Sequence, residues 1–416
     1  MLTQELAFEL REAFGTPLFV YDEATLRGAA QSALAFPNSF GLTVRYAMKA
    51  NPQAAILRIF DQAGLHLDAS SAWEARRGLR AGIVPRRISL SSQELSNDFA
   101  DLVRSGVLFV ATSLHQLRCY GEAFPGTPVA VRFNPGVGSG KKGRTNVGGP
   151  AASFGIWHEW EDEVRSLLRQ YQLALTRIHT HIGSGVDPDA WRRVADLSLG
   201  LVEHFPSVTS LDLGGGFRVA RMPAERSTDL TQVGSLVRES FHRFAERTGR
   251  SIHLEIEPGT WLVAQAGVLL ATVQDIVATG PSGHTFLRLD AGMTEILRPC
   301  MYGAQHPMRL WTTETRDGRH PYVVVGHCCE SGDILTTVAD DPTTIEERWL
   351  PRAVIGDILE IGATGAYCAS MSAAHYNSFP MAAEVLLSIG GAPPRLVRRR
   401  GSLDDIIRNE LPQTED

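Results

Sequence analysis

Lys49 is the first residue whose type and position together suggest chemistry. It stands in the sequence YAMKAN, directly after the apolar, strand-like run Thr43–Ala47. We expect a lysine in this place to be at least partly buried, and desolvation lowers the pKa of an ammonium group so that the amine can attack a carbonyl. A lysine that pairs with a carboxylate at a strand end is the alternative, and position alone favours it.

Three consecutive glycines could bind an anion. Gly214, Gly215 and Gly216 follow another strand-like segment. Backbone N–H groups that no side chain covers can bind phosphate oxygens at such a turn, and the hydroxyl of Ser184 could add a donor. A tight turn packed against the fold would need the same glycines, so the run predicts phosphate binding only together with other residues.

Two further side chains could contact a heteroaromatic ring. Glu257 ends a strand-like segment in the apolar sequence LEIEP, and a buried carboxylate there needs a partner. A protonated pyridine nitrogen would serve, and its proton makes the ring an electron sink; a salt bridge to an arginine is the alternative. His181 could stack on the ring, although a lone histidine is more often part of the core. His179 shares its strand face, but we find no further ligands at suitable spacing and predict no metal site.

A thiol and a carboxylate stand side by side later in the chain. Cys329 and Glu330 belong to HCCESGD, which follows the strand-like sequence YVVVG. A thiol next to a carboxylate can donate a proton or bind an amino group. A simple turn through Ser331, Gly332 and Asp333 is the alternative.

A repeating pattern of strands and helices is expected to position these residues. Strand-like runs occur at Thr43–Ala47, Leu65–Ala69, Arg87–Ser91, Val107–Thr112, Pro128–Phe133, Arg177–Ile182, Val208–Leu213 and Ile252–Glu257. Helix-periodic segments between them include Ser71–Ala81, Glu94–Ser105, Trp160–Gln170, Ala190–His204 and Thr231–Thr248. Eight such units are typical of a (β/α)8 barrel, whose active site lies at the carboxyl ends of the strands. A doubly wound sheet would also alternate.

The rest of the chain predicts a β-rich domain. Strand-like runs with few helical segments between them occur at Thr285–Leu289, Tyr322–Val325, Asp357–Ile361 and Ala383–Leu387, and the early run Pro17–Tyr21 is assigned to the same domain. We therefore predict an α/β barrel over residues 22–267 and an all-β domain, from residues 1–21 and 268–416, that completes the active site. The sequence MLTQELAFELREAFG predicts an amphipathic helix rather than a signal peptide.

Composition limits the partners and the compartment. The 416 residues include 44% hydrophobic and 21% charged residues, with a net charge of -6, which gives no reason to expect nucleic acid or an anionic membrane as a partner. No apolar run reaches the roughly 20 residues that span a bilayer. The five cysteines are odd in number and lack CxxC spacing, which indicates a reducing compartment. We predict a cytoplasmic protein that acts on a small molecule.

Taken in order, the motifs resemble those of a known family. They are YAMKAN, LDASSAWE, HTHIGSG, LDLGGGF, EIEPG, DAGM…RP..YGA, HCCESGD and ATGAYCASMSAAHYN. Each is weak or moderate alone, but the ordered set is similar to that of the fold-type III decarboxylases that use pyridoxal 5′-phosphate, and most to the diaminopimelate decarboxylases among them. The resemblance implies an alanine racemase-like fold, in which a cofactor-binding barrel is joined to a β-sandwich or β-barrel domain.

The resemblance also implies a cofactor site. Lys49 would hold the cofactor as a Schiff base, Asp68 would lie near that lysine and the ring, and His181 would stack on the ring. Glu257 would pair with the pyridine nitrogen. The remaining contacts, most of them to the phosphate or its surroundings, would come from Ser184, Gly214, Gly215, Gly216, Gly259 and Tyr367.

A substrate site and a dimer are implied in the same way. Arg298 and Tyr302, with Tyr367 beside them, would hold a substrate carboxylate, since a guanidinium fits that geometry. Cys329 would donate a proton and Glu330 would bind the distal amine, both in the site of the neighbouring subunit of a homodimer. The expected reaction is decarboxylation of meso-2,6-diaminopimelate to L-lysine and CO2, the last step of lysine biosynthesis.

One departure from the family pattern leaves alternatives open. Thr260 follows Glu-Pro-Gly where the family usually has an arginine, and we hypothesise that Lys141, Lys142 or Arg144 in a glycine-rich loop supplies the missing charge. The alternative function is a related decarboxylase that acts on another diamino acid or on a precursor of polyamines or secondary metabolites. An amino-acid racemase is less favoured because we find no second base, and a non-catalytic regulator is disfavoured by the full set of candidate residues.

Overall fold

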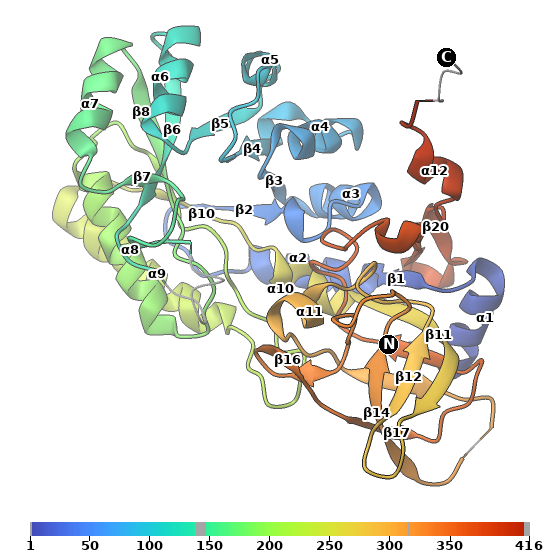
Figure 1. Cartoon of the computed structure of the whole chain (residues 1–416). Helices are drawn as coiled ribbons and strands as arrows, with labels where there is room; N and C mark the ends of the chain where they lie inside the picture. The colour runs from blue at the N-terminus through green and yellow to red at the C-terminus, as the bar shows by residue number, and fades with distance from the viewer. Residues whose placement is uncertain (1, 139–146, 315, 412–416) are drawn as a thin grey trace. The chain divides into compact units, whose positions relative to one another are not determined.

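The chain divides into two compact units, and each is described by itself. The computed structural model describes residues 2–138, 147–314 and 316–411. The barrel unit comprises residues 26–220 and 226–262, and the β unit comprises residues 1–25, 221–225 and 263–416 (Figure 1). The domain limits expected at residues 22 and 267 stay a prediction, because a division by compactness does not test whether each part folds alone.

Eight parallel strands of the barrel unit close into a barrel. They are β2 (Leu42–Ala47), β3 (His66–Ala69), β4 (Ile88–Leu90), β5 (Leu108–Ala111), β6 (Pro128–Asn134), β8 (Ala174–Thr180), β9 (Ser210–Asp212) and β10 (His253–Ile256). Each pairs in parallel with the next, β5 pairs with β6, and β10 returns to β2. The two-residue strand β7 (Ile156–Trp157) adds to β6. Each of the eight predicted runs overlaps one of these strands, so the barrel is confirmed and the doubly wound sheet was the wrong alternative.

Helices connect the strands along the outside of the barrel (Figure 1). They are α2 (Glu23–Leu34), α3 (Ala54–Ala63), α4 (Ala72–Arg80), α5 (Phe99–Arg104), α6 (Leu114–Ala123), α7 (Glu161–Gln170), α8 (Pro188–Glu203), α9 (Leu230–Thr248) and the short α10 (Thr260–Val263). The helix predicted from Glu94 begins only at Phe99. The preceding segment is held as a loop because the Ser92 carbonyl accepts hydrogen bonds from Thr112 Oγ1 at 2.9 Å and Gln116 Nε2 at 3.0 Å.

The helix N-termini lie on the same rim of the barrel as the carboxyl ends of the strands. Side chains cap them: Ser71 Oγ accepts from the Glu74 N–H at the start of α4, and Asp229 accepts from two N–H groups at the start of α9. Because each helix starts shortly after a strand ends, this rim collects the residues that follow the strands, as the barrel prediction requires.

The β unit is built on a mixed sheet. Its strands are β1 (Leu18–Asp22), β11 (Gly267–Ala278), β12 (Thr285–Leu289), β13 (Met308–Trp311), β14 (Arg319–Val325), β17 (Arg348–Pro351), β18 (Ile358–Ile361), β19 (Ala383–Leu387) and β20 (Arg395–Arg398), with the small pair β15 (Thr337–Val338) and β16 (Asp341–Ile345) beside it. Strand β1 pairs with β11 and β19, so the early run is part of this sheet.

Short helices accompany this sheet. They are α1 (Gln4–Phe14), α11 (Arg298–Tyr302) and α12 (Leu403–Ile407). Helix α1 buries Ala7 and Leu10 against Leu18 and Val385 of the sheet, so the predicted amphipathic helix is confirmed.

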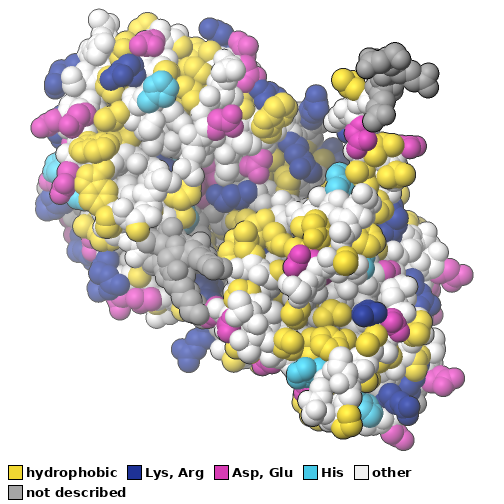
Figure 2. Space-filling model, viewed as in Figure 1, with side chains coloured by type: hydrophobic (Ala, Val, Ile, Leu, Met, Phe, Trp, Pro, Cys, Tyr) yellow, Lys and Arg dark blue, Asp and Glu magenta, His cyan; other side chains and the backbone are white. Residues whose placement is uncertain are grey.

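Charged side chains of both signs lie next to one another on the face shown in Figure 2. This mixture agrees with the small net charge of -6. Among the described helices, none has the length and apolar character needed to span a bilayer.

Candidate active site

Lys49 lies just beyond the carboxyl end of β2, in the short 3-10 turn η1 (Met48–Ala50). Met48 and Ala50 are buried, but the Lys49 side chain is exposed. The expectation of a buried ammonium is therefore wrong, because the turn carries the lysine out of the packed strand end. Its Nζ donates a hydrogen bond to Ser70 Oγ at 3.3 Å. An exposed amine on a rigid turn remains accessible to a carbonyl compound.

Two predicted cofactor residues flank this turn. Asp68 is the penultimate residue of β3, opposite Ala47 in the register of the two strands, and only 2% of it is exposed. Burial raises the pKa of Asp68, while the charge of Lys49 opposes the shift. A Cβ on Gly259 would lie 3.2 Å from the Ala47 Cβ, so only a residue without a side chain packs easily there. Lys49, Asp68 and Gly259 are thus brought together.

The three glycines form a turn that Asp212 holds in place. Asp212 ends β9, and its Oδ1 accepts a hydrogen bond from the Gly214 N–H at 2.8 Å. Gly214 has a φ of +70° and Gly216 a φ of +99°, values that favour glycine. The Gly216 carbonyl accepts from the Gly185 N–H at 3.2 Å, which ties this turn to the segment after β8.

Close backbone approaches explain why all three positions are glycine. A Cβ would lie 2.6 Å from His181 Cγ at Gly214, 2.1 Å from the Glu257 carbonyl oxygen at Gly215 and 1.9 Å from the Gly183 carbonyl oxygen at Gly216. The expected residues His181, Ser184 and Glu257 therefore converge with the glycine turn. The alternative, that the glycines form a tight turn packed against the fold, also describes this segment. Such a turn is compatible with anion binding.

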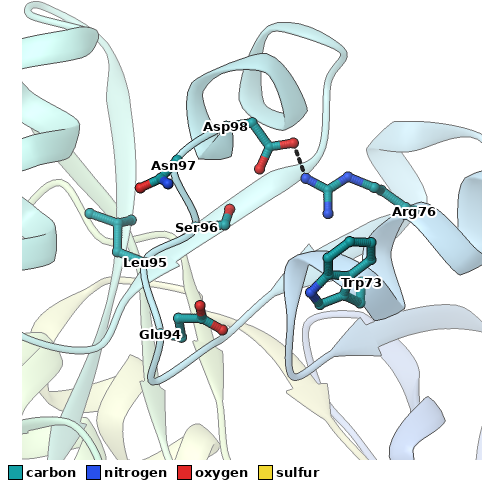
Figure 3. A pocket seen from close by; sticks show the side chains of 7 residues that line it. All are labelled: Trp73, Arg76, Glu94, Leu95, Ser96, Asn97 and Asp98. Atoms are coloured by element: carbon teal, nitrogen blue, oxygen red, sulfur yellow. Dashed lines mark hydrogen bonds and ion pairs between the residues drawn. The ribbon is translucent and has the colours of Figure 1, made fainter. Parts of the chain in front are cut away.

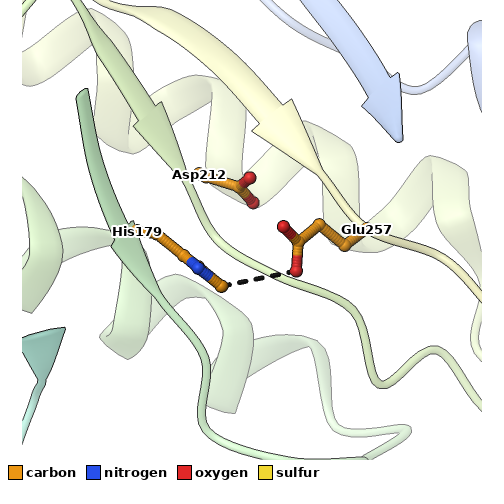
Figure 4. Close-up of side chains that lie close together, drawn as sticks. All are labelled: His179, Asp212 and Glu257. Atoms are coloured by element: carbon orange, nitrogen blue, oxygen red, sulfur yellow. Dashed lines mark ion pairs between the residues drawn. The ribbon is translucent and has the colours of Figure 1, made fainter. Parts of the chain in front are cut away.

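Glu257 belongs to a buried cluster with His179 and Asp212 (Figure 4). Its Oε2 lies 3.3 Å from His179 Nε2, and one potential ligand atom from each of the three residues lies within 4.8 Å of the others. The sequence did not reveal this grouping, because His179 and Asp212 lie on separate strands and Glu257 directly follows a third, far apart in the chain.

An arginine already supplies positive charge to this cluster. Arg177 on β8 forms ion pairs with Asp212, with Glu255 at 2.9 Å and, at the longer distance of 3.9 Å, with Glu257. Arg45 pairs with the same Glu255 at 2.6 Å. The arginine partner considered for Glu257 is thus present, although it is closer to the other two acids. The Arg177 guanidinium supplies the positive charge that a metal ion would otherwise supply among these carboxylates. That no metal binds here stays our prediction.

Burial shifts the pKa values of the titratable groups in this cluster toward their uncharged forms. Burial raises the pKa of Glu257 well above its usual value, and the nearby charges of Asp212 and Asp68 raise it further. Burial also lowers the pKa of His179 and of His181 well below the usual value, with Arg132 adding to both shifts. The site therefore offers a carboxyl group that is more easily protonated than usual and two imidazoles that favour the neutral form.

In the β unit, Cys329 and Glu330 lie on an exposed turn. The Cys329 N–H donates to Asn377 Oδ1 at 2.8 Å, and Asp333 accepts from the Cys328 N–H at 2.9 Å, so the turn is held at both ends. The Gly332 N–H lowers the pKa of Glu330, which keeps its carboxylate ionised. The alternative, a simple turn, describes the backbone of this segment, but the turn also presents the thiol and the carboxylate to solvent.

The predicted carboxylate-binding residues also lie in the β unit. Arg298 and Tyr302 are the first and last residues of α11, and Arg298 Nε is buried without a hydrogen-bond partner among the described residues. Tyr367 is half-buried and has a φ of +55°, which is strained for a residue with a side chain. Strain of this kind is common at ligand-binding positions.

Comparison with known proteins identifies the family. Residues 27–264 match the family described as pyridoxal-dependent decarboxylase, pyridoxal binding domain. The chain belongs to the pyridoxal-dependent decarboxylases. It is 36% identical to diaminopimelate decarboxylase from Streptomyces coelicolor, over 95% of this chain and 90% of that protein. It is 35% identical to the Escherichia coli K12 protein of the same name, over 99% and 97%.

Solved structures agree with this membership. A crystal structure of diaminopimelate decarboxylase superposes with a TM-score of 0.91 at 33% identity and covers 99% of this decarboxylase and 98% of that chain. The Helicobacter pylori diaminopimelate decarboxylase complexed with L-lysine gives a TM-score of 0.83 at 26% identity, with coverage of 96% and 98%. The barrel with an attached β unit is thus the architecture of these relatives.

The residues of this decarboxylase fit pyridoxal phosphate. Three buried polar atoms, Glu257 Oε1, His181 Nδ1 and Asp68 Oδ1, have no hydrogen-bond partner among the described residues. Buried polar atoms without partners are costly, and a polar ring would satisfy them. The glycine turn carries no side chains that would keep a phosphate away from its backbone, and Lys49 offers an amine for an aldehyde.

Some functional residues were missed from the sequence. Asp212 was noted only as part of a motif, yet it holds the glycine turn and contacts Arg177. Arg177 and Glu255 received no role. The available signal was the alternation of polar residues along β8 and β10, which places Arg177, His179 and His181 on the same side of one strand. The hypothesis about Lys141, Lys142 and Arg144 concerns positions outside the described residues.

A shallow pocket of about 490 Å³ lies elsewhere in the barrel unit (Figure 3). It is lined by Trp73, Arg76, Glu94, Leu95, Ser96, Asn97 and Asp98. Arg76 forms an ion pair with Asp98 and stacks over Trp73, with 4.9 Å from its guanidinium carbon to the ring centroid. None of the predicted site residues lines this pocket, and we assign it no role.

Proposed function

We propose that this decarboxylase converts meso-2,6-diaminopimelate to L-lysine and CO2, the final reaction of lysine biosynthesis. The observation that carries the proposal is the set of an exposed Lys49, a glycine turn and a buried Glu257 with a raised pKa around one rim of the barrel. The choice of substrate is supported by similarity to diaminopimelate decarboxylases over nearly the whole chain.

The barrel residues would hold the cofactor and keep its ring protonated. Pyridoxal phosphate, when bound, supplies an aldehyde and a ring that accepts electrons from the bond to the departing carboxylate. Lys49 Nζ would bind the aldehyde carbon and give way to the amine of the substrate. Glu257 would keep a proton on the ring nitrogen, and the neutral imidazole of His181 would contact the ring. Gly214, Ser184 and their neighbours would bind the phosphate.

The β-unit residues would bind the substrate and return a proton. Arg298 and Tyr302 would bind the carboxylate that is retained, and the ionised Glu330 would bind the distal ammonium group. The thiol of Cys329 would donate a proton to the carbon that has lost CO2. We infer that Cys329 and Glu330 act in the site of a partner subunit, so that the enzyme is a homodimer with shared active sites.

Mixed dimers test the shared site. Lys49→Ala and Cys329→Ala are expected to be inactive when each is purified alone. If the sites are shared, a mixture that exchanges subunits will regain activity, because some sites then combine an intact Lys49 with an intact Cys329. A mixture shown to exchange subunits that stays inactive would argue that each chain builds its own site.

The free thiols of the described cysteines support a cytoplasmic location, which cell fractionation would test.

A substrate panel tests the reaction itself. The full chain with added pyridoxal phosphate should release CO2 from meso-diaminopimelate and not from L-lysine, L-ornithine or L-arginine. Borohydride reduction followed by peptide mass spectrometry should place the cofactor on Lys49. If the enzyme turns over another amino acid and not meso-diaminopimelate, that amino acid becomes the proposed substrate, and the related decarboxylase that Thr260 suggests is favoured. Loss of optical activity without CO2 release would indicate a racemase, and no reaction on any amino acid would favour the regulator.

A further inference from the structure

A short segment of the β unit, residues 375–379, contacts the turn that carries Cys329 and Glu330. The Cys329 N–H donates a hydrogen bond to Asn377 Oδ1 at 2.8 Å. The Tyr376 hydroxyl donates to Glu330 Oε2 at 3.4 Å. Two neighbouring side chains of one segment therefore contact the two residues of the turn that are expected to act on the substrate. We call residues 375–379 the anchor segment.

The anchor segment also contacts the start of the turn. The ring of Phe379 stacks on the His327 imidazole, with 3.6 Å between the ring centroids and 6° between the planes. His327 Nε2 lies 2.7 Å from Thr294 Oγ1, so the imidazole is held at its edge as well as on its face. The turn is thus fastened to one segment at three places, positions 327, 329 and 330.

The backbone of the anchor segment is strained. His375 has a φ of +67°, Asn377 a φ of +49° and Ser378 a φ of +60°. Hydrogen bonds from the Ala373 N–H to the Met293 carbonyl at 3.0 Å and from the Ser378 N–H to the His375 carbonyl at 2.9 Å fix this conformation. Left-handed backbone in residues with side chains costs free energy and is concentrated at functional sites. The strain therefore points to a functional role for the segment.

We propose that Asn377 and Tyr376 are positioning residues for the reaction. Asn377 fixes the backbone from which the Cys329 thiol projects. Tyr376 orients the carboxylate of Glu330 through Oε2, because the Gly332 N–H already binds Oε1. This inference rests on the proposed function, in which the thiol donates a proton to the carbon that has lost CO2. A proton donor must lie close to the atom that it protonates, and a displacement of about 1 Å can cost about 100-fold in rate.

Hydrogen exchange tests the anchor segment without a substrate. In the full chain loaded with pyridoxal phosphate, Asn377→Gly removes the amide and is compatible with the positive φ. The Cys329 N–H then lacks its acceptor and should exchange up to about 10-fold faster, measured by mass spectrometry on the peptide that spans the turn. Asn377→Asp keeps an oxygen acceptor and should restore the wild-type rate. The matched control, Ser378→Gly, removes a neighbouring side chain at a similar φ and should leave the rate unchanged.

Turnover in deuterated water tests whether the anchor segment serves the proton transfer. In wild type the carbon that has lost CO2 should take up one deuteron in a single configuration, because the thiol delivers it from one side. Asn377→Gly should lower kcat about 10- to 100-fold with little change in KM, and its product should contain both configurations. Tyr376→Phe should instead raise KM about 2- to 5-fold and leave kcat and the configuration unchanged.

The outcomes separate this inference from the proposed reaction. If wild type releases CO2 from another amino acid and not from meso-diaminopimelate, the proposed substrate is wrong, and the same deuterium experiment is done with that amino acid. Unchanged exchange in Asn377→Gly, or equally fast exchange in Ser378→Gly, would overturn the inference. A single product configuration in Asn377→Gly would overturn it too, because a purely structural loss lowers the amount of active enzyme and does not change the side from which the deuteron arrives.

Discussion

Arg177 is the buried cation that balances the charged interior of the barrel, and Arg177→Met removes that charge while keeping an apolar side chain of similar reach. Arg177 is paired with Asp212 and with Glu255 at 2.9 Å, and its Nη1 donates to Ser89 Oγ at 2.9 Å. The substitution leaves acids buried with Arg45 as their remaining partner at Glu255. We therefore expect a large loss of stability.

The magnitude follows from the cost of an uncompensated buried charge. Removing one partner of a buried ion pair costs about 3 to 5 kcal/mol. In a unit of this size each kcal/mol lowers the unfolding temperature by about 2 to 4 °C, so the expected decrease at neutral pH is about 6 to 20 °C. Arg193→Met is the matched control: Arg193 and its partner Asp187, 3.6 Å away, are both exposed, and we expect a loss below about 1 kcal/mol.

The loss should also depend on pH. Burial, with Asp212 and Asp68, already raises the pKa of Glu257, and removal of Arg177 takes away a charge that opposes this shift. A carboxyl group with a raised pKa in the folded state favours folding below its unfolded value and loses that contribution as pH rises through the folded value. The deficit of Arg177→Met should therefore be smaller near pH 5 than near pH 8. Thermal unfolding followed by circular dichroism at both pH values measures it, and equal stability to wild type, or a deficit that does not change with pH, would refute the reasoning.

Two further substitutions test the glycine turn and a buried acid of the β unit. Gly216→Ala places a Cβ 1.9 Å from the Gly183 carbonyl oxygen at a φ of +99°, so pyridoxal phosphate affinity in absorbance titrations should fall about 10-fold or more, whereas Gly249→Ala, with φ +70° and no atom within 4 Å, should leave it unchanged. Burial raises the pKa of Glu295 to about 7, so this group stabilises the fold below its unfolded pKa and loses that contribution as pH rises through about 7. Glu295→Gln should therefore gain up to about 3 kcal/mol over wild type above pH 8 and little at pH 4.5; a difference in unfolding temperature that is the same at both pH values would contradict this.

The barrel, and the grouping of most candidate cofactor residues at one rim, could be predicted from the sequence. Apolar runs bounded by polar helices mark the strands because the strands of a parallel barrel are buried on both faces. The residues after the carboxyl ends of β2, β9 and β10 were found for the same reason: a barrel collects them on one rim wherever they stand in the chain. Lys49, Gly216 and Glu257 were identified in this way.

The contacts inside the barrel could not be predicted. Alternation along a strand shows that Arg177 and Glu255 share the inner side with the site residues, but not which acid meets which arginine, because that depends on the stagger of strands far apart in sequence. The exposure of Lys49 depends on one 3-10 turn that has no sequence signal. The grouping of Arg221 with the β unit likewise arises from tertiary contacts of a five-residue segment, 221–225.

The charged interior couples the stability of the barrel to its chemistry. The burial that raises the pKa of Glu257 also makes every ionised carboxylate nearby costly in free energy. Arg177 offsets that cost at Asp212 and Glu255, and it lies farther from Glu257, at 3.9 Å. A closer arginine would stabilise the barrel further but would favour ionised Glu257 before the cofactor arrives. The arrangement therefore places the closest compensation on Asp212 and Glu255, and leaves Glu257, the acid proposed to face the cofactor ring, with a raised pKa.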